Sequence, residues 1–226
     1  TDSRGLSDAR SFLLYDHGDI PGVEREFDPG TVTFVHLTPN SRWAVFTVDE
    51  RYAIYSARLD GERLVLPTPR SPDPFVRLAQ ADPSRDFQLA PDGSRAVFFG
   101  FPGLFSVLVD GHGQAEQIVA EDPEGARVRS FAIEARSTRV VFSLGEDGAP
   151  AGLFSAPIDG REPPVRLSPL RAWSYAGTPP GPAPEAGVLD FQLAPDGAWV
   201  LFRLRAGETH LFVVPTDGSA PARHLA

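Results

Sequence analysis

The 226-residue chain contains no cysteine, no lysine and no methionine, and the first two absences exclude whole kinds of chemistry. Without cysteine there can be no disulfide bond, no thiol nucleophile and no thiolate metal site. Without lysine there can be no Gly-rich phosphate loop of the type that ends in Lys. The single asparagine, Asn40, is followed by Ser41 and Arg42, so the sequence has no N-glycosylation motif.

Positive charge and long apolar runs are also scarce. The chain has 30 acidic residues against 21 arginines, which gives a formal net charge of −9. An acidic surface argues against DNA or RNA as a partner. No apolar run reaches about 18 residues, so we expect no membrane span. A composition of 42% hydrophobic and 23% charged residues is that of a globular protein.

An eight-residue segment recurs and defines a repeat. Residues 86–93 read Asp-Phe-Gln-Leu-Ala-Pro-Asp-Gly, residues 190–197 are identical, and weaker copies occupy 34–41 and 130–137. Seven residues after the proline position of each copy stands a phenylalanine; a second aromatic residue follows, and five residues after it comes Asp-Gly. The phenylalanines are Phe46, Phe98, Phe142 and Phe202, and the second aromatics are Tyr55, Phe105, Phe154 and Phe212.

Each copy predicts four short strands. In the second copy they cover 87–90, 95–99, 104–109 and a stretch that ends near Val119. The turns contain Pro-Asp-Gly and Asp-Gly, where glycine tolerates the positive φ of a tight turn. Turn residues every eight to ten positions or so, between Val-, Phe-, Leu- and Ile-rich runs, indicate an all-β protein. The first copy is shorter, and we expect its fourth strand near Leu66.

A repeated four-stranded antiparallel unit of about 40 residues is typical of a propeller blade. We therefore predict an all-β fold, a β-propeller with full blades at 31–67, 86–120, 130–168 and 190–226 and half a blade at 1–30. Two interpretations of the half blade stay open: Thr1 is a cut inside a larger ring, or the ring closes with a two-stranded fifth blade. The long connectors, roughly 67–85 and 168–189, should lie on one face of the disc.

The repeat resembles a known family. The Asp-Phe-x-Leu-x-Pro-Asp-Gly motif, the Val-Phe strand and the Leu-Phe…Asp-Gly hairpin are similar to the WD40-like PD40 repeats of TolB-type β-propellers. Similar repeats occur in the propeller domains of prolyl-oligopeptidase-type serine peptidases. The resemblance covers about residues 34–226, and the third copy departs from it because Ala135-Arg136-Ser137 replaces Pro-Asp-Gly. It implies a scaffold fold and leaves the function open.

Polar residues at the start of two innermost strands are candidate binding residues. Asp86 and Asp190 begin these strands, and Gln88 and Gln192 follow two residues later. They could form an acidic channel mouth that binds a ligand or ion and prefers a neutral or basic segment. Alternatively, the aspartates cap backbone N–H groups and the glutamines line a wet channel.

The connector at 168–189 supplies a second group of candidates, Arg171, Trp173 and Tyr175. A structureless connector of this length is usually functional or disordered, and loop aromatics have the composition of interface anchors. The alternative is that these aromatics fold back and cover their own blade.

The sequence offers no enzymatic or metal-binding motif. Gly-x-Ser-x-Gly is missing, and no two of the five histidines lie three to five residues apart. We therefore predict no catalytic residue, no metal site and no cofactor. Trp43 and Trp199 share one repeat column with Arg95 and Arg139, which indicates packing in the outer half of the blades.

These observations favour a non-enzymatic propeller scaffold of TolB-like type that binds a protein or peptide on its connector face. The family resemblance implies export to the periplasm or cell envelope. The alternative is the substrate-gating propeller domain of a larger serine peptidase, whose catalytic domain is not in this chain. Terminal blades that expose sheet faces and strand edges would also promote self-association.

Overall fold

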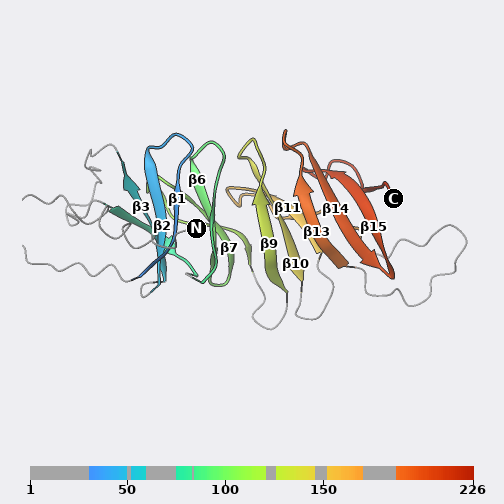
Figure 1. Cartoon of the computed structure of the whole chain (residues 1–226), viewed down its shortest axis with the longest axis horizontal. Coiled ribbons are helices and arrows are strands. Elements are labelled where there is room, and N and C mark those ends of the chain that lie inside the picture. Colours follow the sequence, from blue (N-terminus) through green and yellow to red (C-terminus); the bar gives the residue numbers. More distant parts are fainter. Residues whose placement is uncertain are drawn as a thin grey trace, which may run out of the picture.

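The computed structural model describes residues 31–49, 52–59, 75–82, 84–120, 126–145, 152–169 and 187–226. Within these ranges the chain forms sixteen strands and no helix. The strands make four sheets, and each sheet holds four antiparallel strands in chain order (Figure 1). The predicted all-β fold of four-stranded blades is therefore confirmed. The predicted half blade at 1–30 lies outside the described residues.

Each blade starts with its innermost strand. The first blade contains β1 (Val32–Leu37), β2 (Trp43–Val48), β3 (Ala53–Arg58) and β4 (Phe75–Gln80). The second contains β5 (Gln88–Leu89), β6 (Arg95–Gly100), β7 (Gly103–Leu108) and β8 (Glu116–Ala120). The third contains β9 (Arg127–Ile133), β10 (Arg139–Gly145), β11 (Gly152–Pro157) and β12 (Val165–Arg166). The fourth contains β13 (Gly187–Leu193), β14 (Trp199–Ala206), β15 (Glu208–Pro215) and β16 (Arg223–His224).

The fourth strand of the first blade is not where the sequence predicts it. We expected this strand near Leu66, but β4 pairs with β3 through residues 75–80. The extra residues of this repeat therefore lie between its third and fourth strands. Only a short stretch, 81–87, then joins β4 to the innermost strand of the second blade.

This shift also overturns the prediction that both long connectors lie on one face of the disc. Neighbouring strands are antiparallel, so the chain leaves a third strand and a fourth strand at opposite ends of the sheet. The long segment after β3 (Ala53–Arg58) starts at one end, and the long segment after β12 (Val165–Arg166) starts at the other. The last residues of these two strands, Arg58 and Arg166, consequently lie at opposite ends of their sheets.

The two aromatic columns of the repeat are cross-strand neighbours, which confirms the alignment of the four copies. In every blade the phenylalanine of the second strand stands opposite the aromatic residue of the third strand. The four second-strand phenylalanines are all buried, with exposed fractions of 0–4%. The ring centroids of the stacked pairs lie 5.4–6.0 Å apart: Phe46–Tyr55, Phe98–Phe105, Phe142–Phe154 and Phe202–Phe212.

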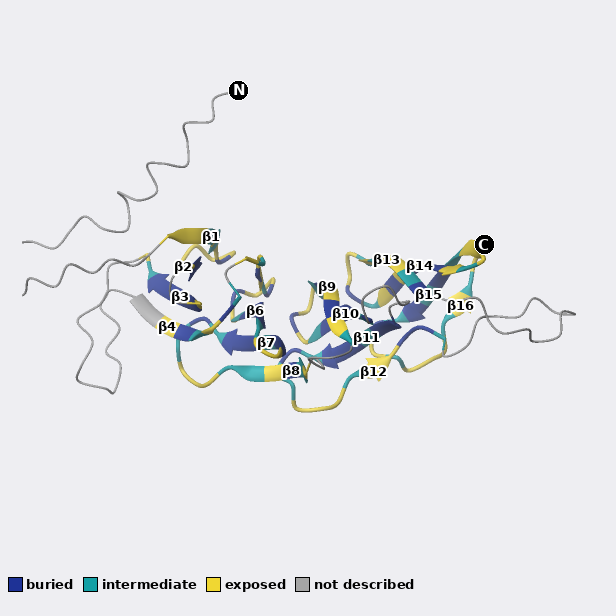
Figure 2. Cartoon of the chain, turned by 90° about the horizontal axis from the view of Figure 1, so that it is seen from below, coloured by how far each residue is buried: buried dark blue, intermediate teal, exposed yellow. Residues whose placement is uncertain are grey.

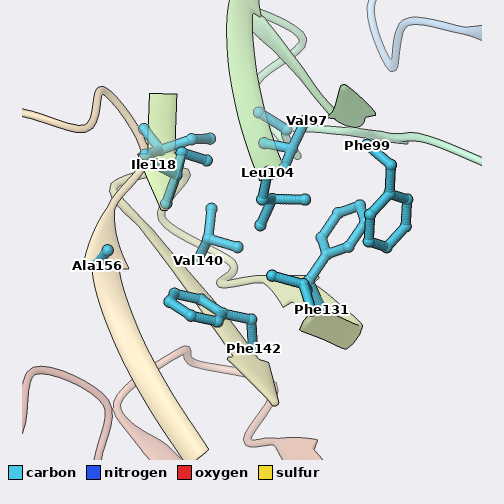
Figure 3. Close-up of a cluster of buried hydrophobic side chains, with 11 residues drawn as sticks. Val97, Phe99, Leu104, Ile118, Phe131, Val140, Phe142 and Ala156 are labelled. Atoms are coloured by element: carbon cyan, nitrogen blue, oxygen red, sulfur yellow. The ribbon is translucent and has the colours of Figure 1, made fainter. Parts of the chain in front are cut away.

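Most of the hydrophobic core lies between the blades, and a smaller buried cluster lies within the first blade: Phe46, Val48, Ala53, Tyr55 and Ala57. Three clusters join the first blade to the second, the second to the third and the third to the fourth. Figure 3 shows the middle cluster, where Val97, Phe99 and Leu104 of the second blade face Val140 and Phe142 of the third. Seen from below, the blades radiate in an open arc with β1, β9 and β13 on the inner side (Figure 2).

Candidate binding site at the inner edge of the second and third blades

A hollow of about 370 Å³ opens between the innermost strands of the second and third blades. This volume is near the lower end of the range for small-ligand sites. Its lining combines charged, polar and aromatic side chains: Arg85, Asp86, Phe87, Gln88, Phe99, Arg129, Ser130 and Phe131. Two of the predicted site residues, Asp86 and Gln88, therefore lie in one site.

Arg85 forms one wall of the hollow and joins the two blades. Its guanidinium carbon lies 3.2 Å from the centroid of the Phe99 ring, a cation–π contact within the second blade. One guanidinium nitrogen donates a hydrogen bond of 3.0 Å to the carbonyl oxygen of Val128 in the third blade. These contacts fix the orientation of the arginine, so its charge is held at a defined place.

Asp86 makes two contacts with the same carboxylate oxygen, Oδ1. It accepts a hydrogen bond of 2.8 Å from the backbone N–H of Phe87. This contact caps a backbone N–H group, as expected if the aspartate has a structural role. The same oxygen also lies 2.8 Å from Nε2 of His36 in the first blade. The His36 ring packs edge-to-face against Phe87, with centroids 4.7 Å apart. The aspartate therefore links two blades while about half of its side chain stays exposed.

Gln88 links the second blade to the third. Its side-chain N–H donates a hydrogen bond of 2.9 Å to the carbonyl oxygen of Phe131. His36 occupies the same repeat position in the first blade and also reaches the next blade. The third blade has Ala132 at this position, which is too short to reach across. Our sequence reasoning missed His36, although its alignment with Gln88 was a usable signal.

The second aspartate and glutamine do not join this site. Asp190 pairs with Arg203 of its own blade, with Nε at 2.8 Å from one carboxylate oxygen and 3.1 Å from the other. The hydrogen bonds and the positive charge of Arg203 hold the pKa of Asp190 below its ordinary value. Gln192 is exposed on the same blade. Of the four predicted residues, the structure brings together only Asp86 and Gln88.

The loop candidates Arg171, Trp173 and Tyr175 lie outside the described residues.

Nowhere in the described ranges do three histidine, aspartate or glutamate side chains gather closely enough to hold a metal ion. No helix that could cross a membrane occurs in the part of the chain that the structure describes.

The charge of the hollow differs from the expected acidic mouth. Two arginines, Arg85 and Arg129, line it against a single aspartate, Asp86. The acidic channel mouth marked by Asp86 and Asp190 stays a prediction, which considered only the repeated Asp-x-Gln pattern. Arg129 comes from the neighbouring innermost strand, β9, whose position beside Asp86 is a property of the packed blades.

Comparison with solved structures identifies the fold. No family model and no curated protein sequence matches the chain. Among solved structures, the yeast Nup82-Nup159-Nup116 nucleoporin complex aligns with a TM-score of 0.51 and 13% identity, over 80% of this chain and 42% of that one. A dipeptidyl aminopeptidase IV-like protein from Bacteroides ovatus aligns with a TM-score of 0.52 and 10% identity, over 85% and 29%. The chain has the β-propeller fold.

A TolB-like protein from Agrobacterium tumefaciens also aligns, with a TM-score of 0.49 and 16% identity, over 88% of this chain and 62% of that one. The chain thus spans less than two thirds of each of these structures. At such identities the likeness concerns the propeller fold alone. In this propeller the hollow lies at the inner edge of two blades, where first strands face the centre of the arc (Figure 2).

Proposed function

We propose that this propeller is a scaffold that binds a protein or peptide segment in the hollow between the second and third blades, without catalysing a reaction. The observation that carries the proposal is the mixed lining of the hollow. Arg129 supplies donors, Asp86 supplies acceptors, and Ser130 supplies both. Such a set suits the alternating N–H and C=O groups of an extended peptide.

The hydrogen bonds of the polar groups near the hollow favour binding over catalysis. A nucleophile must lie within hydrogen-bonding distance of the base that activates it. Within the described ranges, the ring of His36 hydrogen-bonds to Asp86, and the hydroxyl of Ser130 lies 2.8 Å from that of Ser143. This serine is therefore paired with another hydroxyl and not with a base.

Peptide selection followed by titration tests the proposal. A phage library of unconstrained dodecapeptides is selected on the purified chain, and enriched peptides are titrated against wild type, Arg129→Glu and Arg136→Glu. Arg136 is exposed in the turn of the same blade and does not line the hollow, so it is the matched control. We expect Arg129→Glu to weaken binding by roughly ten-fold or more and the control to change it less than about two-fold. Peptides that ignore Arg129→Glu would contradict the proposal.

A second candidate is the substrate-gating domain of a larger serine peptidase. The likeness to the Bacteroides ovatus dipeptidyl aminopeptidase IV-like protein is the observation that favours it. A fluorophosphonate probe, which labels active serine hydrolases, separates the two candidates when it is applied to the native polypeptide that carries these residues. Labelling supports gating, and absence of labelling supports the scaffold.

We also propose export to the cell envelope, which rests on the resemblance of the repeats to those of TolB-type propellers. Fractionation of the source cells, followed by detection with an antibody raised against residues 187–226, tests this location. Recovery of the protein in the cytoplasmic fraction would contradict it.

A further inference from the structure

Two exposed aromatic residues stand at the same end of the first two blades. Tyr52 lies in the turn between β2 and β3 and is 58% exposed, and Phe101 lies in the turn between β6 and β7 and is 87% exposed. These are equivalent turns of the repeat, so both residues lie at strand ends and not on the outer face of a blade. Single exposed apolar residues are common, whereas neighbouring aromatic residues are typical of a contact surface.

One short connector brings the two turns together. The backbone N–H of Ala81 donates a hydrogen bond of 2.8 Å to the carbonyl oxygen of Tyr52, and the N–H of the next residue, Asp82, donates one of 2.7 Å to the carbonyl oxygen of Phe99. Because adjacent residues are about 3.8 Å apart, these two carbonyl oxygens lie within about 10 Å of each other. Phe101 follows Phe99 by two residues. The first two blades also lie side by side in both views (Figure 1; Figure 2).

The turn that carries Phe101 is held firmly by the outermost strand of its blade. The side chain of Gln117 in β8 donates a hydrogen bond of 2.8 Å to the carbonyl oxygen of Pro102. A Cβ atom at Gly103 would lie 2.1 Å from the carbonyl oxygen of Val119, so β8 packs directly against the backbone of the turn. The exposed ring therefore stands on a fixed support, and a partner that binds it has little of the turn to order.

Arginine covers aromatic rings elsewhere in this chain. In each of the first three blades a guanidinium carbon lies 3.2–5.8 Å from a ring centroid: Arg58 over Trp43, Arg85 over Phe99 and Arg166 over Phe154. Within the described ranges no guanidinium and no second ring contacts Tyr52 or Phe101. These two exposed rings therefore lack the cation that covers other rings of the repeat.

Acidic side chains accompany the two rings. Asp49 is exposed in the same turn as Tyr52, and Asp82 is half-buried on the connector between the two turns. Neither makes an ion pair with a described residue. A guanidinium that stacks on a ring can also bond to a nearby carboxylate, so this composition suits arginine. We call Asp49, Tyr52, Asp82 and Phe101 the aromatic surface.

We propose that the aromatic surface binds an extended, arginine-containing segment of a partner protein. Alternate side chains of an extended segment lie about 7 Å apart on one side, which suits two rings on neighbouring turns. The net charge of −9 favours the approach of such a segment. None of the four residues lines the hollow, so this is a second contact surface, separate from the proposed peptide site.

Fluorescence polarisation with model peptides tests the proposal. The probe is fluorescein-labelled Gly-Arg-Gly-Arg-Gly-Arg-Gly, and its control is the peptide in which every arginine is replaced by lysine. The two peptides carry the same charge, so the general attraction of an acidic chain acts equally on both. We expect the arginine peptide to bind roughly three-fold more tightly or better, because guanidinium stacks on rings and bonds to carboxylates at the same time.

Variants of the chain locate the binding. Phe101→Leu keeps an apolar side chain but removes the ring, and it should weaken binding of the arginine peptide by roughly two- to five-fold. Trp199→Leu, at a position that is 46% exposed in the fourth blade, is the matched control and should change nothing. Asp82→Asn keeps the oxygen that accepts hydrogen bonds from Ser84 but removes the charge, so it should also weaken binding. Asp196→Asn makes the same change of charge in a turn at the other end of the strands and should have little effect.

Three results would overturn the proposal: no binding of the arginine peptide up to millimolar concentration, equal affinities for the arginine and lysine peptides, or an affinity that Phe101→Leu leaves unchanged. Circular dichroism confirms that the variants fold, which is expected because Phe101 is exposed. The hollow is tested separately with Arg129→Glu, so either proposal can fail while the other stands.

Discussion

Replacing Gly160 by alanine tests whether the Asp-Gly hairpins of the repeat also set the spacing between blades. Gly160 lies in the hairpin between β11 and β12 and has a φ of +65°. A Cβ atom added there would lie 2.5 Å from the carbonyl oxygen of Gln117, which belongs to β8 of the second blade. The glycine is therefore required twice, once for the turn and once for the contact with the neighbouring blade.

The two requirements have separate costs. A left-handed conformation costs a non-glycine residue roughly 1–2 kcal/mol. An ordinary contact begins at 3.4 Å, so the hairpin must also move about 0.9 Å away from the backbone of β8. Overpacking of this kind typically costs about 1–3 kcal/mol, because a backbone carbonyl cannot swing aside as the end of a side chain can. We therefore expect Gly160→Ala to lower the free energy of unfolding by about 2–5 kcal/mol.

Gly207→Ala is the matched control. Gly207 also has a positive φ, +80°, but a Cβ atom there would meet nothing within 4 Å. This variant should lose only the conformational cost of roughly 1–2 kcal/mol. Urea denaturation followed by tryptophan fluorescence and circular dichroism measures both variants. Equal losses of stability in the two variants would refute the idea that Gly160 sets the blade spacing.

Three further perturbations have defined outcomes. Ser106→Val should lower the free energy of unfolding by about 1–3 kcal/mol, because it removes a hydroxyl that bonds to the next blade. In the same urea assay Ser56→Val should be neutral or stabilising, because that buried hydroxyl has no hydrogen-bond partner among the described residues. Phe142→Ala removes a fully buried ring and should cost about 3–5 kcal/mol, so a loss below about 1 kcal/mol would contradict the inter-blade core. Because Arg203 lowers the pKa of Asp190, their pairing stabilises the native state above about pH 4 and is lost as the pH falls through the lowered pKa. Asp190→Asn should therefore flatten the fall of stability between about pH 5 and pH 2, and an unchanged acid limb would contradict this.

The fold could be predicted because the repeat constrains positions that are buried or half-buried in every blade. Phe98 and Phe105 keep fixed distances from their turns, since the pairing register of a hairpin follows from its turn. The position of β4 (Phe75–Gln80) could not be predicted in the same way. An outermost strand pairs with one neighbour only, so little in its sequence distinguishes it from a loop. In the other copies the fourth strand lies at a fixed distance from the Asp-Gly dipeptide. The insertion in the first repeat changes this distance, so it could not be used to place β4.

The candidate site was harder to predict than the fold. Asp86 was recognised from its repeated position, but its partner His36 lies fifty residues earlier in a different blade. Arg129 reaches the hollow because the first strands of two blades lie side by side. Such contacts depend on how neighbouring sheets are placed, and a repeat describes one sheet at a time. The best available signal for a contact between blades is a repeat position that holds different polar residues in different copies, as His36 and Gln88 do.

The places where a copy departs from the repeat are also the places where blades contact one another differently. Ser137 stands where Gly93 and Gly197 stand in the two identical copies, and it keeps their left-handed turn with a φ of 59°. A serine in this conformation is strained, but its hydroxyl accepts a hydrogen bond of 3.0 Å from the backbone N–H of Asp92 in the preceding blade. Val213 stands where the other three blades have a buried serine, so its side chain cannot make such a contact. Departures from this repeat are therefore best understood as changes in what each blade face contacts.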